Sequence, residues 1–171
     1  MQITNHDDLD ILTKFQNANK EVVAMTVKQW LQEEELALHD INSDKTDFYF
    51  AFKQGNINMN VGFYKKRKDS LIVSGNLEFG PQEQKMTRYA RTKKELSYDI
   101  EKIFIQMNLD YVLKSNIIDG EFTVDDIILR KTIYFDGLSK DKFFDITSSI
   151  YNCFKILVGK LMLLGIQHQF V

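Results

Sequence analysis

The segment Asn56-Ile-Asn-Met-Asn-Val-Gly-Phe-Tyr64 decides the fold class, because its polar and apolar residues alternate strictly. Ile57, Met59, Val61 and Phe63 would lie on one face of a strand, with asparagines and a glycine between them on the other. Successive side chains of a strand point to opposite faces. The pattern therefore predicts a β-sheet that is covered on one side.

Two neighbouring segments extend this pattern into a sheet. Residues 47–53 are rich in aromatic side chains, and the alternation returns in residues 70–79 at Leu71, Val73, Leu77 and Phe79. The connections at residues 54–56 and 65–69 are too short for a crossover. The three strands are therefore predicted to form an antiparallel meander.

Helical patterns precede and follow the meander. Thr26-Val-Lys-Gln29 has the form of a capping box, which predicts a helix from there to about Leu38. After Pro81, apolar residues spaced three and four apart predict a long helix to about Lys114. This helix carries a main apolar stripe and a second, thinner one.

The remaining chain predicts two strands and a closing helix. Residues 117–135 are β-branched and aromatic, and a turn or bulge at Asp125-Asp126 is expected to divide them. Ser139 is predicted to cap a helix that runs to about Leu164. Its core face comprises Phe143, Ile146, Ile150, Phe154, Leu157, Leu161 and Leu164, widened by Phe144, Tyr151, Val158 and Met162.

The resulting order is α-β-β-β-α-β-β-α. An α+β fold with one antiparallel sheet and helices packed on one face is the simplest arrangement of these elements. Residues 1–25 are expected to form an N-terminal arm or short helix. Residues 26–171 are expected to form a single α+β domain, as the length of 171 residues suggests.

Composition bounds the class of protein. A hydrophobic fraction of 44% and a charged fraction of 27% are typical of a globular chain. The formal net charge of -2 gives no global field that would attract nucleic acid. The acidic start differs from a signal peptide, and the apolar run at residues 154–166 is too short to span a bilayer. We expect a soluble, cytoplasmic protein that does not bind membranes.

One stretch of sequence resembles a known superfamily. Ile133-Tyr-Phe-Asp-Gly-Leu-Ser139, followed by Lys140-Asp-Lys-Phe-Phe144, is similar to the last strand, tight turn and closing helix of the type III secretion chaperone-like superfamily. That superfamily includes YbjN-type domains and uncharacterised archaeal members, and the resemblance covers roughly residues 26–165. It implies a secretion-chaperone-like domain, homodimerisation and the binding of other polypeptides, and it supplies no catalytic residues.

No catalytic, metal or cofactor site is expected. His6, His39 and His168 are far apart in sequence and lack ligand spacing. Cys153 is the only cysteine, which excludes an intramolecular disulfide and favours a reducing compartment, and its place beside Phe154 predicts a buried residue. The acids Asp125, Asp126, Asp136 and Asp141 could form an acid–base pair, but turns and helix caps explain them more simply.

The run Lys65-Lys-Arg-Lys68 is a weak candidate for a nucleic-acid contact. Lys65, Lys66, Arg67 and Lys68 form the most concentrated charge in the chain, in a predicted hairpin connection. Such a run usually forms a solvated tip. No aromatic residue spaced for base stacking is evident beside it, since Phe63 belongs to the inward alternation. Nucleic acid is therefore not the expected partner.

The second stripe of the long helix is the candidate for a partner or dimer surface. It consists of Tyr98, Ile105, Leu109 and Val112. Exposed apolar patches tend to mark contacts between proteins. The alternative is that residues 1–24 or a neighbouring helix cover the stripe within one chain.

Together these observations favour a non-enzymatic protein-binding module of chaperone-like or adaptor type that homodimerises and binds a polypeptide. The alternative is a small-molecule-binding protein or an enzyme with a pocket between the sheet and the long helix. Tyr49, Tyr64, Tyr89 and Tyr134 are the aromatic residues that could line such a pocket.

Overall fold

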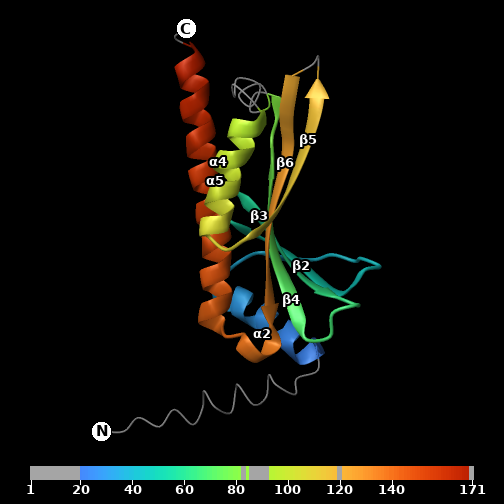
Figure 1. The fold of residues 1–171 in the computed structure, drawn as a ribbon. Coiled ribbons are helices and arrows are strands. Elements are labelled where there is room, and N and C mark those ends of the chain that lie inside the picture. The colour runs from blue at the N-terminus through green and yellow to red at the C-terminus, as the bar shows by residue number, and fades with distance from the viewer. Residues whose placement is uncertain (1–19, 82–83, 85–92, 119–120, 170–171) are drawn as a thin grey trace, which may run out of the picture. The chain divides into compact units, whose positions relative to one another are not determined.

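The structure, a computed structural model, describes residues 20–81, 84, 93–118 and 121–169 (Figure 1). Its elements are α2 (Lys20–Glu33), β1 (Leu38–Asp40), β2 (Thr46–Gln54), β3 (Ile57–Tyr64), β4 (Ser70–Glu78), α4 (Lys93–Gln106), β5 (Asp110–Ile118), β6 (Glu121–Tyr134), the 3₁₀ turn η1 (Phe135–Gly137) and α5 (Lys140–Gln169).

The strands form one six-stranded antiparallel sheet in the order β1-β2-β3-β4-β6-β5. The predicted α+β class and the order of helices and strands are confirmed. The predicted order lacked only β1, a three-residue strand that pairs with the end of β2. Since β1 and β5 are the outer strands, the two edges of the sheet differ threefold in length.

The meander predicted from the alternating segments is confirmed. Ile57, Met59, Val61 and Phe63 are all buried, and β2 pairs with β3 through a tight turn. Gly55 occupies the left-handed region at φ 60°, which glycine adopts without a steric penalty.

Two helices end earlier than predicted because a non-glycine residue turns left-handed at each end. Glu35 has φ 55°, and the Leu36 amide donates to the carbonyl of Leu31. Asn108 has φ 52°, and the Leu109 amide donates to the carbonyl of Phe104. Both are Schellman motifs, in which the left-handed residue breaks the helix and the next amide satisfies an orphan carbonyl.

The predicted start of the first helix was also wrong. Thr26 does not cap a helix: it lies in the middle of α2, where its hydroxyl donates to the carbonyl of Val22 at 2.8 Å. A hydroxyl that bonds back to the preceding turn is the usual arrangement for threonine inside a helix. The helix begins at Lys20, six residues earlier.

A bulge lies where the sequence placed one, but it does not divide a strand. Lys114 pairs with Asp126 and Ser115 with Val124, which leaves Asp125 as the extra residue of β6. The carbonyl of Asp125 accepts the amide of Phe79. The strand continues from Glu121 to Tyr134, and its partner β5 occupies residues that the sequence assigned to the long helix.

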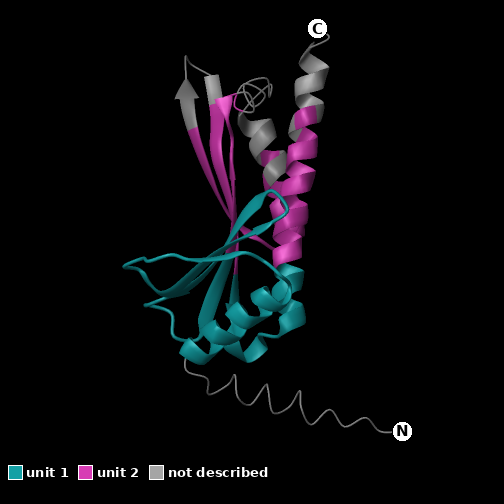
Figure 2. Cartoon of the chain, turned by 180° about the vertical axis from the view of Figure 1, so that it is seen from behind, with its two compact units in different colours: residues 1–73, 132–146 teal, residues 74–131, 147–171 magenta. Residues whose placement is uncertain are grey.

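The chain divides into two compact units (Figure 2). Unit 1 comprises Met1–Val73 and Thr132–Ile146, and unit 2 comprises Ser74–Lys131 and Thr147–Val171. The elements β4, β6 and α5 each contribute residues to both units.

Aromatic packing builds the core of unit 1. The ring of Phe63 lies 6.1 Å from those of Phe48 and Phe50 and 6.2 Å from that of Phe135. The apolar side of α2 is buried at Val23, Ala24, Val27 and Leu31. Aromatic pairs at such distances add to the stabilisation from area burial.

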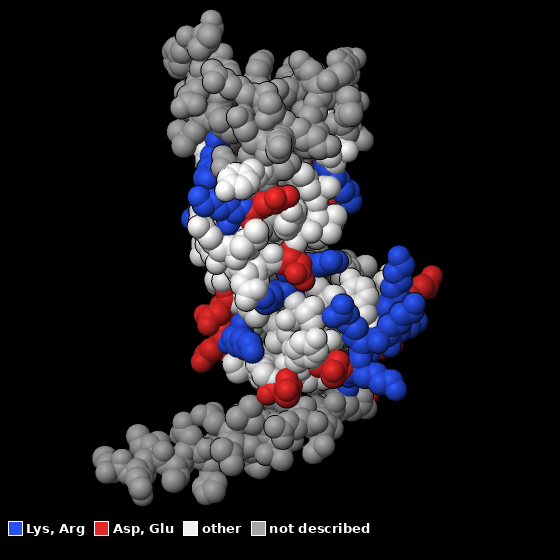
Figure 3. Space-filling view, viewed as in Figure 1, with Lys and Arg blue, Asp and Glu red and all other residues white. Residues whose placement is uncertain are grey.

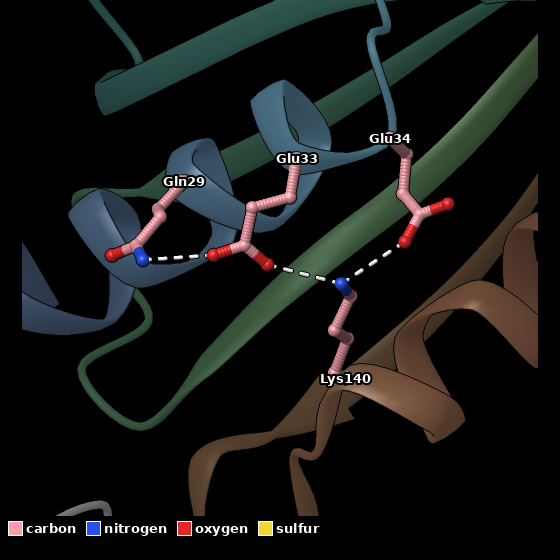
Figure 4. Close-up of polar contacts among 4 residues, drawn as sticks. All are labelled: Gln29, Glu33, Glu34 and Lys140. Carbon is pink, nitrogen blue, oxygen red and sulfur yellow. Dashed lines mark hydrogen bonds and ion pairs between the residues drawn. The ribbon is translucent and has the colours of Figure 1, made fainter.

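A polar cluster joins α2 to the first turn of α5 in unit 1 (Figure 4). The ammonium of Lys140 lies 3.0 Å from a carboxylate oxygen of Glu33 and 3.0 Å from one of Glu34. Gln29 donates to the other oxygen of Glu33 at 2.8 Å. The hydrogen bond from Lys140 lowers the pKa of Glu33, and the acceptors Glu34 and Glu33 raise the pKa of Lys140.

Ser139 caps α5 as predicted, accepting the Lys142 amide at 3.2 Å. The strand, turn and helix that carry the superfamily resemblance are therefore present as β6, η1 and α5.

In unit 2, α4 packs on the sheet beside β5. The rings of Phe104 and Tyr111 lie 5.0 Å apart, and the Tyr111 hydroxyl donates to Glu101 at 2.8 Å. This hydrogen bond raises the pKa of Tyr111. Among the described residues, the core of unit 2 also includes Phe79, Ile103, Leu109, Val124, Ile127, Leu129, Ile150, Cys153, Phe154 and Leu157.

Candidate functional site

The outer side of α4 exposes two large apolar residues of the predicted stripe. Tyr98 is 65% exposed and Ile105 is 73% exposed. They are seven residues apart, which is two helical turns, so they share one face of α4. Exposed apolar residues that gather into a patch tend to mark contacts between proteins.

The other two members of the stripe do not lie on this helix. The prediction of one helix to Lys114 was wrong, because α4 ends at Gln106. Leu109 is only 8% exposed and follows the left-handed Asn108. A buried apolar residue at this position commonly accompanies a Schellman motif. Val112 is exposed on the edge strand β5, where it alternates with the inward Tyr111.

Two apolar residues of α5 that the sequence did not assign to a surface are also exposed in unit 2. Ile156 and Met162 each lie three residues from Gly159, so they flank it on the helix surface. Nothing lies within 4 Å of the place that a Cβ on Gly159 would take. Met162, expected to widen the core face, is 55% exposed. We call Tyr98, Ile105, Ile156 and Met162 the helical face.

Unit 1 presents the basic turn at Lys65–Lys68. All four side chains are exposed, as is Lys45, whose carbonyl accepts the Lys65 amide at 3.1 Å. The guanidinium of Arg67 donates a hydrogen bond to the hydroxyl of Thr132 on β6, at 3.4 Å. Within the described part of the chain, no carboxylate forms an ion pair with any of these cations. Figure 3 shows Lys and Arg side chains gathered on one flank of the lower half.

The tyrosines proposed for a pocket lie elsewhere. Tyr49, Tyr64 and Tyr134 alternate with inward residues of β2, β3 and β6, so they lie on the outer side of the unit 1 sheet. They therefore do not line a pocket between the sheet and α4. Tyr89 falls outside the described residues.

Cys153 is positioned as a core residue. Its side chain is fully buried, and burial raises the pKa of the thiol to about 11. A thiol with so high a pKa is protonated near neutral pH and is a poor nucleophile.

The four acidic residues of the predicted pairs lie in β6, η1 and the first turn of α5. The carboxylate of Asp126 is buried and lies 2.7 Å from the ammonium of Lys114, whose pKa it raises. Asp125 accepts a hydrogen bond from Gln84 at 3.3 Å, while Asp136 lies in η1 and Asp141 in the first turn of α5. Among described residues, no three His, Cys, Asp or Glu side chains gather as a metal site.

The histidines do not come together in what the structure describes. His39 is exposed on β1, while His6 and the side chain of His168 fall outside the described parts. A shallow hollow runs along the outer side of α2, beside Val22 and Met25. The described residues that line it all belong to one helix, whereas small-molecule sites are usually concave and mostly apolar, with a few placed polar groups.

Comparison with known proteins places the chain in a family. A profile described as Uncharacterized conserved protein (DUF2299) matches residues 23–161. The chain belongs to the DUF2299 family. No curated protein matches this DUF2299 chain. In the described residues, no helix combines the length and apolar character needed to cross a membrane.

Two solved structures are similar to this DUF2299 chain. An uncharacterized protein from Methanothermobacter thermautotrophicus is similar with a TM-score of 0.71 at 16% identity, covering 81% of this chain and 95% of that one. YbjN from E. coli gives a TM-score of 0.44 at 11% identity, covering 84% and 91%. The first of these establishes a shared fold.

Proposed function

We propose that this DUF2299 protein is a non-enzymatic protein-binding module of chaperone-like or adaptor type that self-associates through the helical face. The observation that carries the proposal is the exposure of Tyr98, Ile105, Ile156 and Met162 on two helices of one unit. Figures 1 and 2 both show α4 running alongside α5 in this unit.

Burial of these side chains would supply the driving force. Removing a large apolar side chain from water stabilises a complex by about 1.5–3 kcal/mol. Gly159 favours a helical partner in particular, because the absence of a side chain lets another backbone approach closely. A second copy of the chain brings the same face, as a two-fold dimer requires.

The superfamily resemblance supports the same proposal. Type III secretion chaperone-like domains, which residues 133–144 resemble, are expected to homodimerise and to bind other polypeptides. The chaperone-like or adaptor role extends this expectation to a polypeptide partner. The exposed edge of β5, beside Val112, is a surface to which an extended polypeptide could add as a strand.

The test is a charge placed in the helical face. Ile105→Glu should weaken self-association about 100-fold, or about 2.8 kcal/mol, because a carboxylate would be buried against apolar side chains. Light scattering during gel filtration over a concentration series measures this. Ile105 is mostly exposed, so the variant should keep the circular dichroism spectrum of the wild type.

Two controls carry the same charge outside the face. Gln106→Glu changes the next, exposed residue of α4, and Met25→Glu changes an exposed apolar residue of α2. Both should associate like the wild type. A wild-type chain that stays monomeric at every concentration would contradict self-association, and equal effects of all three variants would contradict this location.

A further inference from the structure

On the outer side of the unit 1 sheet, two tyrosine side chains pack against a glycine. Tyr49 lies opposite Gly62 in the β2–β3 ladder, and Tyr64 lies two residues beyond it on the same side. The two rings come within 3.2 Å and 2.9 Å of the place that a Cβ on Gly62 would take. Both rings therefore pack against Gly62.

The pair is half-buried. Burial, together with the neighbouring phenol of Tyr64, raises the pKa of Tyr49. Half-buried tyrosines of this kind combine an apolar ring with a polar hydroxyl that can reach a partner.

A third tyrosine lies at the same end of the sheet. Tyr134 is the last residue of β6 and is 56% exposed. The next residue, Phe135, donates its amide to the carbonyl of Asp69 at 2.8 Å, which fixes Tyr134 beside the basic turn. Neighbouring strands are about 4.8 Å apart, so the tyrosines of β2 and β6 span about 14 Å across three strand spacings.

Basic residues adjoin these tyrosines along the chain and across the strands. Lys65 directly follows Tyr64, and Arg67 crosses to Thr132, two residues before Tyr134. Lys66 and Lys68 complete the turn. In the part of the chain that the structure describes, no carboxylate pairs with these four cations, whereas Asp47 holds the nearby Lys20, which also donates to the carbonyl of Tyr64 at 2.9 Å.

We infer that this surface binds single-stranded nucleic acid. We call it the tyrosine–lysine face: Tyr49, Tyr64, Tyr134, Lys65, Lys66, Arg67 and Lys68. Unstacked bases stack on aromatic side chains of an open sheet, while lysines and arginines contact the phosphates. An acidic polypeptide would use the cations alone and leave three aromatic rings without a role. A duplex hides the flat faces of its bases and would use only the cations as well.

The inference is independent of the proposed self-association, because it concerns unit 1 and different residues. The two predictions can therefore fail separately. Ile105→Glu should leave nucleic-acid affinity per chain unchanged, and variants of the tyrosine–lysine face should leave the mass in solution unchanged.

The test is fluorescence anisotropy with labelled oligo(dT) and oligo(U) of about twelve nucleotides, within the range of known single-strand sites. Three or four phosphate contacts predict about 20- to 50-fold weaker binding when potassium chloride rises from about 50 to about 200 mM. Binding of either oligonucleotide supports the inference, and their ratio distinguishes DNA from RNA as the preferred form.

Two variants separate stacking from charge. Tyr134→Ala should weaken binding at least about fivefold without changing the salt dependence, because it removes a stacking surface only. Neutralising Lys65, Lys66 and Lys68 together, each to Gln, should reduce the slope of log affinity against log salt by about 2. Neutralising three exposed lysines of α5 (Lys142, Lys155 and Lys160, each to Gln) removes equal charge and should leave affinity unchanged.

Competition decides the class of partner. Poly-glutamate of matched charge should compete far less well than unlabelled oligonucleotide. If it competes equally, the face binds acidic chains generally and the inference is wrong. It is also wrong if duplex DNA binds as tightly as single strands, if Tyr134→Ala binds like the wild type, or if the two triple-lysine variants behave alike.

Discussion

The buried thiol of Cys153 gives a single residue a measurable effect on stability. Its pKa in the folded protein is about 11, against an ordinary value near 9. Between these values the unfolded chain has lost the thiol proton and the folded chain keeps it. Since the unfolded state then binds fewer protons, the free energy of unfolding falls as pH rises.

We therefore expect wild type to lose about 2 kcal/mol of unfolding free energy relative to Cys153→Val between pH 8 and pH 10.5. Valine has a similar volume and cannot ionise, so other groups that titrate in this range cancel in the comparison. Urea unfolding of both proteins at the two pH values measures the difference. Parallel losses in both proteins would show that the thiol is not shielded.

At the scale of secondary-structure elements, the C-terminal end of α2 contains a position where one substitution should raise the stability of the protein. Glu35 is left-handed, a conformation that costs a residue with a Cβ about 1–2 kcal/mol. Glu35→Gly removes that cost, and the greater freedom of glycine in the unfolded chain offsets about half of the gain. The substitution should raise the free energy of unfolding by about 0.5–1 kcal/mol.

The matched control is Gln32→Gly. Gln32 is exposed in the last turn of α2, where glycine should lower stability by about 1 kcal/mol. Urea unfolding followed by the fluorescence of Trp30 measures both changes. If the two glycines act in the same direction, the left-handed turn at Glu35 does not limit stability.

The left-handed turns at Glu35 and Asn108 explain how accurately the ends of the helices and strands could be predicted from the sequence. The strands β2, β3 and β4 were predicted within two residues, because the alternation in residues 56–64 and 70–79 and the aromatic content of residues 47–53 are typical of strands. The ends of α2 and α4 were missed because glutamate and asparagine, rather than glycine, adopt the left-handed turn. The missed end at Asn108 then hid the start of β5, since Val112 also fits a helical spacing.

The candidate surfaces could be predicted less well, because they depend on which side of an element stays open. Tyr98 and Ile105 were identified from spacing alone. Met162 was not, because in a helix that is apolar on most sides the sequence does not show which side neighbours cover. The tyrosines beside the basic turn come from β2, β3 and β6, and only strand pairing brings β6 next to β4.

For the whole molecule, net charge and local charge predict different behaviour. The formal net charge of -2 suggests repulsion from polyanions. Salt screening limits the range of electrostatic interactions to about 10 Å at 0.1 M salt. A polyanion at the basic turn therefore interacts with the charges of that turn alone. We expect retention on a heparin column at pH 7.5 and elution with salt.

The two triple-lysine variants serve as each other's controls in this experiment. The variant neutralised at Lys65, Lys66 and Lys68 should pass through the column, whereas the variant neutralised along α5 should be retained like the wild type. Both have a net charge three units more negative than the wild type. Equal elution of the two would mean that total charge, rather than its position, governs binding.

The unequal edges of the sheet limit how far copies of this protein can polymerise. The outer strand β5 has nine residues and β1 has three. A sheet with two long edges can add strands at both and grow into a fibre. In the sheet that the structure describes, β5 is the one long edge, so a strand that adds there occupies it, and two copies that join through β5 occupy the long edges of both. Growth by strand addition therefore ends at a closed pair.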